Sequence, residues 1–231
     1  MWINWNDLPE NMKNEQVRPY YEKLKQKRGS LITKRLFDIL VSLVMLILLS
    51  WLFLILAIAI KVDSHGPVFY RQVRVTTGNR DFRIFKFRTM VNNADKIGSL
   101  VTTGNDSRIT RVGAKIRKCR LDEIPQLLNI LKGEMSFVGT RPEVRKYVNR
   151  YTDEMMATLL IPAGVTSLAS ISFKDEDGLI DEYTEKGMSV DDAYMEKVLP
   201  EKMKYNLEYM NQFGVFRDIK LMIQTFVSVI K

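Results

Sequence analysis

Residues 39–60 form the longest hydrophobic run of the chain, 22 residues without a charge in which Ser42 and Ser50 are the polar positions. A helix of about 20 apolar residues is long enough to cross a bilayer. Lys and Arg residues lie on both sides of the run, and positive charge marks the cytoplasmic side of a membrane. Both ends therefore favour the same side. This pattern predicts a re-entrant helix that bends near Ser50 and Trp51, with a single spanning helix as the alternative.

After Gly66 the pattern of hydrophobic and polar positions changes to that of strands. Two segments, PVFYRQVRV and DFRIFKFRTM, are joined by TTGNR, which is typical of a β-hairpin. Lys86 and Arg88 fall on one face of the second strand because side chains alternate along a strand with a period of two. A solvated strand face is the simplest interpretation of these two cations.

A helical pattern of apolar positions follows at residues 124–131. Pro125 falls in the first turn of this helix, where a missing N–H costs nothing, and Gly133 marks its end. Asp122 is therefore expected at or near the N-cap. There the helix dipole and the free backbone N–H groups stabilise the ionised form of its side chain.

The other segments give weaker signals. Residues 1–30 are polar and charged, with apolar positions too scattered for a core, although residues 17–24 could form one face of a short interfacial helix. Residues 91–108 are expected to be a loop, and the acidic run at residues 175–185 a solvated loop. A helix is expected to start at Pro142 and Glu143, and residues 205–231 are expected to be helical, with a break at Gly214.

Charge is distributed unevenly along the 231 residues. Residues 1–150 hold 27 Lys and Arg against 13 Asp and Glu, whereas residues 151–231 hold 8 against 14. The basic part favours anionic lipid headgroups, a nucleotide diphosphate or nucleic acid as a partner. The sequence contains no RNA-binding aromatic motif, zinc-finger spacing or DNA-recognition helix, so nucleic acid is the weakest of the three.

The supply of metal ligands limits the chemistry further. Cys119 is the single cysteine, which excludes a disulfide within the chain and fits a reducing compartment. One histidine and one cysteine make a zinc site a poor interpretation. Any metal should be a hard, oxygen-bound cation such as Mg²⁺.

Two adjacent carboxylates, Asp122 and Glu123, stand at the head of the predicted helix. An aspartate before a helix is most often only a cap. Here three basic residues at positions 117–120 precede the pair, and Arg141 follows the helix in a Gly-Thr-Arg-Pro turn. Cations that hold an anion beside a carboxylate that attacks it or binds a metal are typical of chemistry on a phosphate.

The stretch LDEIPQLLNILKGEMSFVGTRP resembles the signature of the bacterial sugar transferase family, the monotopic polyprenyl-phosphate phosphoglycosyl transferases. The resemblance extends through KRLFDILVSLVMLILLS, GPVFYRQVRV and FRIFKFRTM, and it covers most of residues 34–168. Two departures are present. Ser50-Trp51 stands where relatives commonly have Ser-Pro, and PAGVTSLAS stands where they have a Pro-Gly-(Ile/Val)-Thr-Gly-Trp type of loop.

The resemblance implies a fold of the α+β class: a mostly helical single domain with a small β-hairpin and an N-terminal re-entrant membrane helix. Its expected parts are a polar or interfacial segment at residues 1–33, a helix-break-helix in the membrane at residues 34–62, and a catalytic domain at residues 63–231 that ends in amphipathic helices. The implied location is the cytoplasmic face of the bacterial inner membrane.

The resemblance also implies transfer of a phospho-sugar from a UDP-sugar to undecaprenyl phosphate, which begins capsule, exopolysaccharide or glycoconjugate synthesis. Asp122 is expected to attack the β-phosphorus and to form a covalent intermediate, and Glu123 to bind Mg²⁺ or to handle the acceptor's proton. Glu123 and Asp122 are the expected metal ligands. The expected phosphate-binding residues are Arg117 and Arg141, followed by Lys86, Arg88 and Arg145.

Two other functions stay open at this point: a metal-dependent nucleotide-sugar pyrophosphatase, in which water attacks, and a non-catalytic basic membrane adaptor. The sequence leaves open which sugar is transferred, which pathway follows and whether the chain forms a homodimer.

Overall fold

The computed structural model describes residues 2–94, 106–173 and 176–230. The part of the predicted loop at residues 95–105 lies outside them. The expected α+β class is confirmed, because two small sheets lie among many helices. In chain order the helices and strands are α1 (Arg18–Gln26), α2 (Arg28–Leu48), α3 (Ser50–Asp63), β1 (Phe69–Thr76), β2 (Arg80–Phe87), α4 (Arg111–Lys118), α5 (Leu127–Lys132), β3 (Met135–Val138), α6 (Arg145–Val148), β4 (Ala163–Thr166), α7 (Leu168–Ser172), α8 (Glu176–Glu185), α9 (Val190–Ala193), α10 (Leu199–Asn211) and α11 (Val215–Ile230).

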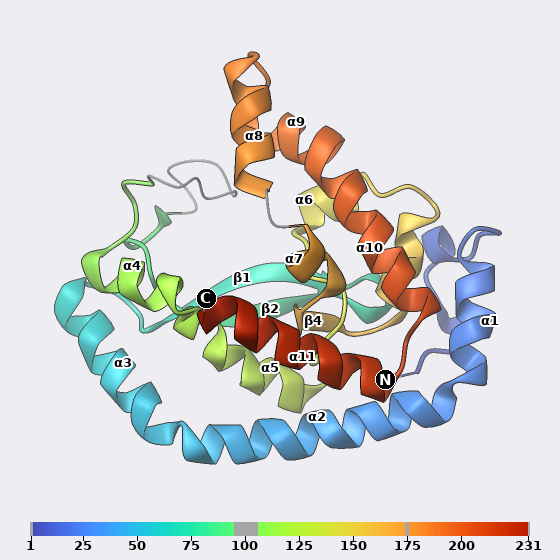
Figure 1. Cartoon of the computed structure of the whole chain (residues 1–231), viewed down its shortest axis with the longest axis horizontal. Helices are drawn as coiled ribbons and strands as arrows, with labels where there is room; N and C mark the ends of the chain where they lie inside the picture. Colours follow the sequence, from blue (N-terminus) through green and yellow to red (C-terminus); the bar gives the residue numbers. More distant parts are fainter. Residues whose placement is uncertain (1, 95–105, 174–175, 231) are drawn as a thin grey trace.

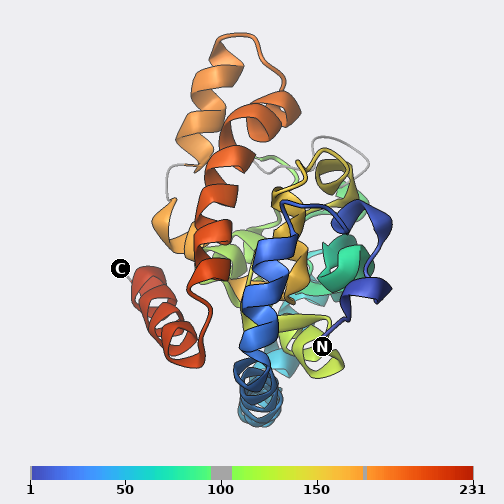
Figure 2. The same cartoon turned by 90° about the vertical axis from the view of Figure 1, so that its right-hand side faces the viewer.

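The hydrophobic run folds as two helices, α2 and α3, which form a bent arm along one edge of the molecule (Figures 1 and 2). In the described part of the chain no single helix is long and apolar enough to cross a membrane, but α2 and α3 together are, with a bend of 62°. The break falls at Leu49, where the backbone leaves helical geometry. No proline is needed, because the Ser50 hydroxyl donates to the Ile47 carbonyl at 2.8 Å.

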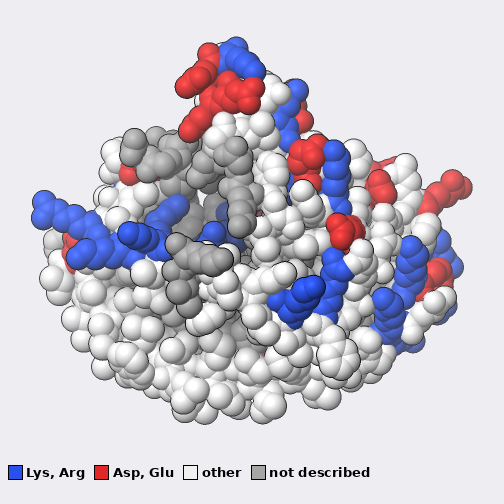
Figure 3. Space-filling model, viewed as in Figure 1, with Lys and Arg blue, Asp and Glu red and all other residues white. Residues whose placement is uncertain are grey.

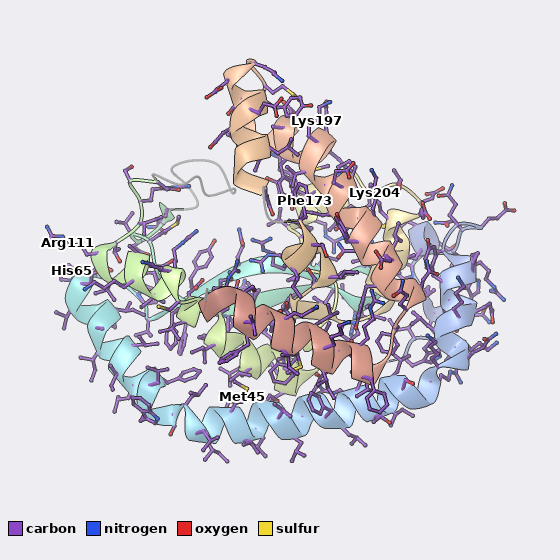
Figure 4. All side chains as sticks on the ribbon, viewed as in Figure 1. Met45, His65, Arg111, Phe173, Lys197 and Lys204 are labelled. Atoms are coloured by element: carbon purple, nitrogen blue, oxygen red, sulfur yellow. The ribbon has the colours of Figure 1, made fainter. Side chains whose placement is uncertain are left out.

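The bent arm exposes apolar side chains on one side and is fastened to the protein on the other. Met45 points from α2 into the body of the molecule (Figure 4) and packs against the main core. Arg35 donates to the Ile130 and Leu131 carbonyls, at 2.5 and 2.8 Å, where α5 ends. A cation at a helix C-terminus also interacts favourably with the helix dipole. The apolar side chains left exposed on α2 and α3 include Leu36, Leu40, Leu43, Ile47, Trp51, Leu54 and Ile58.

A buried ion pair joins the arm to the last helix. Lys34 Nζ lies 2.6 Å from Asp218 Oδ2, and the Tyr209 hydroxyl donates to Asp218 Oδ1 at 2.6 Å. All three side chains are buried. The pair places α11 beside α2, and the predicted helix break near Gly214 is confirmed.

The β-hairpin is confirmed: β1 and β2 pair antiparallel, with Tyr70 opposite Lys86 and Arg74 opposite Phe82. A second sheet was not predicted. It consists of the short strands β3 and β4, which pair in parallel and lie in the main core. Four-residue strands carry too little pattern to identify their partner from sequence.

The N-terminal residues correct one prediction. Residues 17–24 do form a helical face, but the segment before them is not too poor for a core. Met12 and Val17 are fully buried, in a cluster with Leu8, Tyr21 and residues of the 3₁₀ turn Met155–Leu160. The apolar positions looked scattered because their partners lie more than 100 residues further along the chain.

Two local predictions were also wrong. The helix expected from Pro142 begins at Arg145 and makes a single turn. The acidic run is not a loop from residue 176 onward, because Glu176–Glu185 is helix α8.

Asp122 lies near an N-cap, as predicted, but the helix concerned is a 3₁₀ turn. This turn, Leu121–Gln126, precedes α5, its N-cap is Arg120, and Asp122 lies in its first turn.

Asn129 on α5 fixes the hairpin in place. Its Oδ1 accepts from the Phe85 N–H at 2.8 Å, and its Nδ2 donates to the Arg83 carbonyl at 2.9 Å and to Glu134 at 2.7 Å. The amide therefore supplies hydrogen bonds to β2 at the edge that β1 does not cover. Because Asn129 is fully buried, water cannot replace these bonds.

Replacing Asn129 tests this contact. We expect Asn129→Ala to lower the free energy of unfolding by about 3 kcal/mol, because it leaves a buried N–H and a buried carbonyl of β2 without partners. Chemical denaturation of the purified protein measures the change. Asn149 is exposed, so Asn149→Ala is the control and should stay within about 0.5 kcal/mol. Equal effects of the two substitutions would contradict this account of the hairpin.

Candidate active site

A cavity of about 650 Å³ lies beside the hairpin. Its walls come from β1, β2, residues 88–94, α4, the 3₁₀ turn and the Gly-Thr-Arg-Pro turn. Figure 3 shows it as a hollow with blue side chains inside. Of the described residues that line it, Asp122 and Glu123 are the carboxylates, and the cations are Arg74, Lys86, Arg88, Arg108, Arg117, Lys118, Arg120 and Arg141.

Asp122 reaches the cavity because of the turn that precedes it. Arg120 has a φ of +52°, a left-handed conformation that non-glycine residues rarely adopt. The chain then enters the 3₁₀ turn, in which Asp122 is buried. Backbone outliers of this kind cluster at functional sites, where the surrounding structure holds them.

The charge state of Asp122 is set by burial. Burial raises the pKa of Asp122 above its usual value, and Lys86, whose Nζ lies 3.8 Å from Asp122 Oδ2, opposes the shift only in part. The positive charge of Arg117 also lowers the pKa, and the negative charge of Glu123 raises it. The sequence had suggested a carboxylate stabilised by a helix dipole. The structure adds burial, and a partly desolvated carboxylate is more reactive than a well-solvated one.

Glu123 is held differently. Its Oε1 lies 2.9 Å from Lys86 Nζ and 3.1 Å from Arg141 Nη2. We call Lys86, Glu123 and Arg141 the Glu123 cluster. Burial opposes ionisation of Glu123, but the two cations outweigh it and hold its pKa well below the usual range. Glu123 in turn raises the pKa of Arg141. Glu123 is therefore an anion at neutral pH and a poor proton acceptor.

The other predicted phosphate-binding residues separate into two groups. Arg117 and Arg88 line the cavity with Lys86 and Arg141. Arg88 is largely buried and donates to the carbonyl and hydroxyl of Ser64, at 2.6 and 2.9 Å. Arg145 is not brought to the cavity, because it binds Asp81 at 2.6 Å at the far end of the hairpin.

Sequence reasoning missed Arg74, which lines the cavity from β1. Arg74 Nη1 donates to the Pro142 carbonyl at 3.0 Å, next to Arg141. The two-residue period that placed Lys86 and Arg88 on one face also places Tyr70, Gln72 and Arg74 on one face of the first strand. All three line the cavity, so the signal was present in the sequence.

The two carboxylates offer a limited set of metal ligands. Across residues 2–94, 106–173 and 176–230, no group of three or more His, Cys, Asp or Glu could hold a metal ion. Mg²⁺ often uses only one or two carboxylates and takes its remaining ligands from water and substrate phosphates. Asp122 and Glu123 are two neighbouring oxygen donors that fit that kind of site once substrate phosphates offset the surrounding cations.

Comparison with known proteins identifies relatives. A family model described as "Bacterial sugar transferase" matches residues 29–231. The chain is 35% identical over 200 residues to the UDP-N-acetylgalactosamine-undecaprenyl-phosphate N-acetylgalactosaminephosphotransferase of Aeromonas hydrophila, a match covering 85% of this chain and 43% of that protein. It is 34% identical over 201 residues to the UDP-glucose:undecaprenyl-phosphate glucose-1-phosphate transferase of Klebsiella pneumoniae, covering 85% and 40%.

A shorter relative matches over nearly its full length. The exopolysaccharide production protein ExoY of Rhizobium meliloti is 32% identical over 213 residues, which cover 86% of this chain and 85% of that protein. The chain thus spans less than half of the first two relatives but most of the third.

The opposite environments of the two carboxylates predict opposite effects on stability. We expect Asp122→Asn to raise the melting temperature at neutral pH, because it removes a charge that burial disfavours. The gain should shrink as the pH falls through the raised pKa of Asp122 and vanish below about pH 4, where the wild-type group is protonated in both states.

Glu123→Gln should lower the free energy of unfolding by about 2 kcal/mol, less than for a fully buried pair because Arg141 is partly exposed. This loss should persist down to about pH 5. It should fade as the pH drops below about 4.3, because protons then bind Glu123 in the unfolded protein while Lys86 and Arg141 keep it ionised in the folded protein. Melting curves of the two variants and the wild type between about pH 2 and pH 8 measure both effects. Shifts of the same sign in the two variants would contradict the assigned charge environments.

Proposed function

Because this chain belongs to the bacterial sugar transferase family, we propose that it transfers a phospho-sugar from a UDP-sugar to undecaprenyl phosphate. Relatives that match most of the chain are named for transfer of this kind. The observation that supports it most is the placement of Asp122, a buried carboxylate in a cavity lined by cations. A diphosphate donor and a phosphate acceptor are both anions, so such a cavity suits both.

In the first step, a carboxylate oxygen of Asp122 attacks the β-phosphorus of the UDP-sugar. A bond forms between that oxygen and phosphorus, the bond from phosphorus to the bridging oxygen breaks, and UMP leaves with the electron pair. The product on the protein is an acyl-phosphate that carries the sugar. Covalent catalysis of this kind replaces one difficult displacement by two easier ones.

In the second step, a phosphate oxygen of undecaprenyl phosphate attacks the same phosphorus. The new diphosphate bond forms as the bond from phosphorus to Asp122 breaks, which restores the carboxylate. No proton needs to be removed when the acceptor phosphate is a dianion. This chemistry does not require Glu123 to act as a base, in agreement with its lowered pKa.

Lys86 and Arg141 provide the electrostatic part of catalysis. Lys86 Nζ lies between the two carboxylates, 3.8 Å from Asp122 and 2.9 Å from Glu123. Fixed cations beside the reacting phosphorus stabilise the negative charge that develops in the transition state. Glu123 holds both cations in place before substrate arrives. Asp122 and Glu123 would also hold Mg²⁺, which when bound neutralises charge on the diphosphate.

The location we propose is the cytoplasmic face of the bacterial inner membrane, with α2 and α3 as a re-entrant pair. The lower surface in Figure 3, where these helices lie in Figure 1, shows almost no charged residues. Trp51, at the bend, is 62% exposed and adds to this apolar surface. A membrane-bound site gives a polyprenyl acceptor direct access, which a hydrolase of soluble substrates does not need.

Intact-protein mass spectrometry tests the covalent step. Incubation with Mg²⁺ and a panel of UDP-sugars, without lipid, should add one phospho-sugar to the wild type and nothing to Asp122→Asn. Transfer to lipid by Asp122→Asn should fall about 10³-fold or more. Asp81→Asn, which changes an exposed aspartate that pairs with Arg145, is the matched control and should form the adduct normally.

Transfer to lipid without any adduct would contradict the covalent mechanism and favour direct attack by the lipid phosphate. Release of sugar phosphate in the absence of lipid would identify a hydrolase instead.

A further inference from the structure

A second buried carboxylate lies next to the active site without lining its cavity. Glu143 is two residues after Arg141 and only 6% exposed. Its Oε1 accepts a hydrogen bond from the Tyr194 hydroxyl at 2.6 Å. Lys202 Nζ donates to the same hydroxyl at 3.1 Å and lies 3.8 Å from Glu143 Oε1. Glu143 is therefore held by groups from the C-terminal part of the chain.

Glu143 also contacts β1, the strand that carries Arg74 into the cavity wall. Its backbone carbonyl accepts from the Val75 N–H at 3.0 Å, so it is tied to β1. Its Oε2 lies 4.0 Å from Arg74 Nη1, the same nitrogen that donates to the Pro142 carbonyl. Arg74 and Arg141 both line the cavity, and Glu143 is anchored next to each of them.

The backbone that carries Tyr194 is unusual. Residues Tyr194–Val198 form a π-helical turn between α9 and α10. A π turn is rare and concentrates at functional sites, because it places an extra residue into the helix and changes where side chains point. Here the irregular turn begins at the residue whose hydroxyl reaches Glu143.

We propose that Glu143, held by Tyr194 and Lys202, positions Arg141 and Arg74 to receive the phosphates of the UDP-sugar. This inference rests on the proposed function. None of the three lines the cavity, so each is a positioning residue. Their effect follows from geometry, since small displacements of a phosphate-binding guanidinium cost much of its contribution to the transition state.

The charges near Arg141 also support a link between Glu143 and Arg141. The negative charge of Glu143 raises the pKa of Arg141, as does that of Glu176, which Lys202 binds at 3.2 Å. Helices α8 and α10, which stand above the hairpin in Figure 1, are thereby linked to Glu143 through the contacts of Lys202 with Glu176, Tyr194 and Glu143.

Comparison of substitutions at two tyrosines, Tyr194 and Tyr147, tests whether Tyr194 positions the site or only stabilises the fold. Tyr194 and Tyr147 are equally buried, their tilted rings lie 4.8 Å apart, and each hydroxyl donates to a carboxylate at 2.6 Å. The Tyr147 hydroxyl binds Asp191, away from the Arg141 turn. Tyr194→Phe removes the hydrogen bond to Glu143 and the one from Lys202, whereas Tyr147→Phe removes neither.

The experiment measures three quantities for the wild type and both variants: melting temperature, rate of adduct formation, and the dissociation constant for UDP. We expect both variants to lose melting temperature, and Tyr194→Phe to lose more, because it also removes the hydrogen bond from the buried Lys202. Tyr194→Phe should form adduct roughly 10-fold more slowly and bind UDP several-fold more weakly, whereas Tyr147→Phe should stay within about twofold of the wild type for both. Glu143→Gln, which keeps an acceptor for Tyr194, should retain more activity than Glu143→Ala.

Equal rates and equal UDP affinities for the two tyrosine variants would overturn the positioning role. A wild type that forms neither adduct nor lipid product would overturn the proposed function instead, and the UDP affinities would still decide the role of Glu143. Absence of UDP binding in all three proteins would overturn both.

Discussion

The ion pairs of Glu123 with Lys86 and Arg141 are the interaction on which the site depends. They join three segments that are distant in sequence: the second strand of the hairpin, the 3₁₀ turn and the Gly-Thr-Arg-Pro turn. A buried carboxylate is costly unless cations neutralise it, and two cations converging without a carboxylate would repel each other. Each member of the Glu123 cluster therefore makes the position of the others possible.

The same cluster explains how two adjacent carboxylates come to differ. Lys86 and Arg141 lie 2.9 and 3.1 Å from Glu123, and their positive charges keep Glu123 ionised. Asp122 is left with the more distant contact to Lys86, so burial dominates and its pKa rises. One carboxylate organises cations, and the other stays poorly stabilised and reactive. Pairs of groups whose pKa values are pushed apart are a common way to divide catalytic roles.

The parts of the fold that sequence predicted are those fixed by local pattern. The hairpin follows from two alternating segments around TTGNR, and the bend at Leu49 follows from Ser50 bonding back to Ile47. The Asp-Glu pair and Arg141 were recognised through a continuous signature. What escaped depends on contacts over long separations. Burial of Met12 needs the turn at residues 155–160, and the β3–β4 sheet needs two four-residue strands to meet.

The arginines near the site also show that a contact between distant residues cannot be predicted from sequence. Arg145 and Arg141 lie four residues apart in one basic stretch, yet Arg145 turns to Asp81 and Arg141 faces the cavity. Sequence gives the charge of each residue but not the partner that captures it. Arg74 had a usable signal in the alternation of β1, but its proximity to Arg141 arises only when the Pro142 carbonyl is brought to it.

A double-mutant cycle on Glu123→Gln and Arg141→Gln tests most directly whether Glu123 acts through the cations it holds. The readout is the rate of phospho-sugar adduct formation, with Arg145→Gln as the control for loss of one positive charge. If Glu123 works by positioning Arg141, the double variant should be little slower than the slower single variant, and Arg145→Gln should combine additively with Glu123→Gln. Losses for Glu123 and Arg141 that simply multiply would contradict the account, because the two residues would then contribute independently.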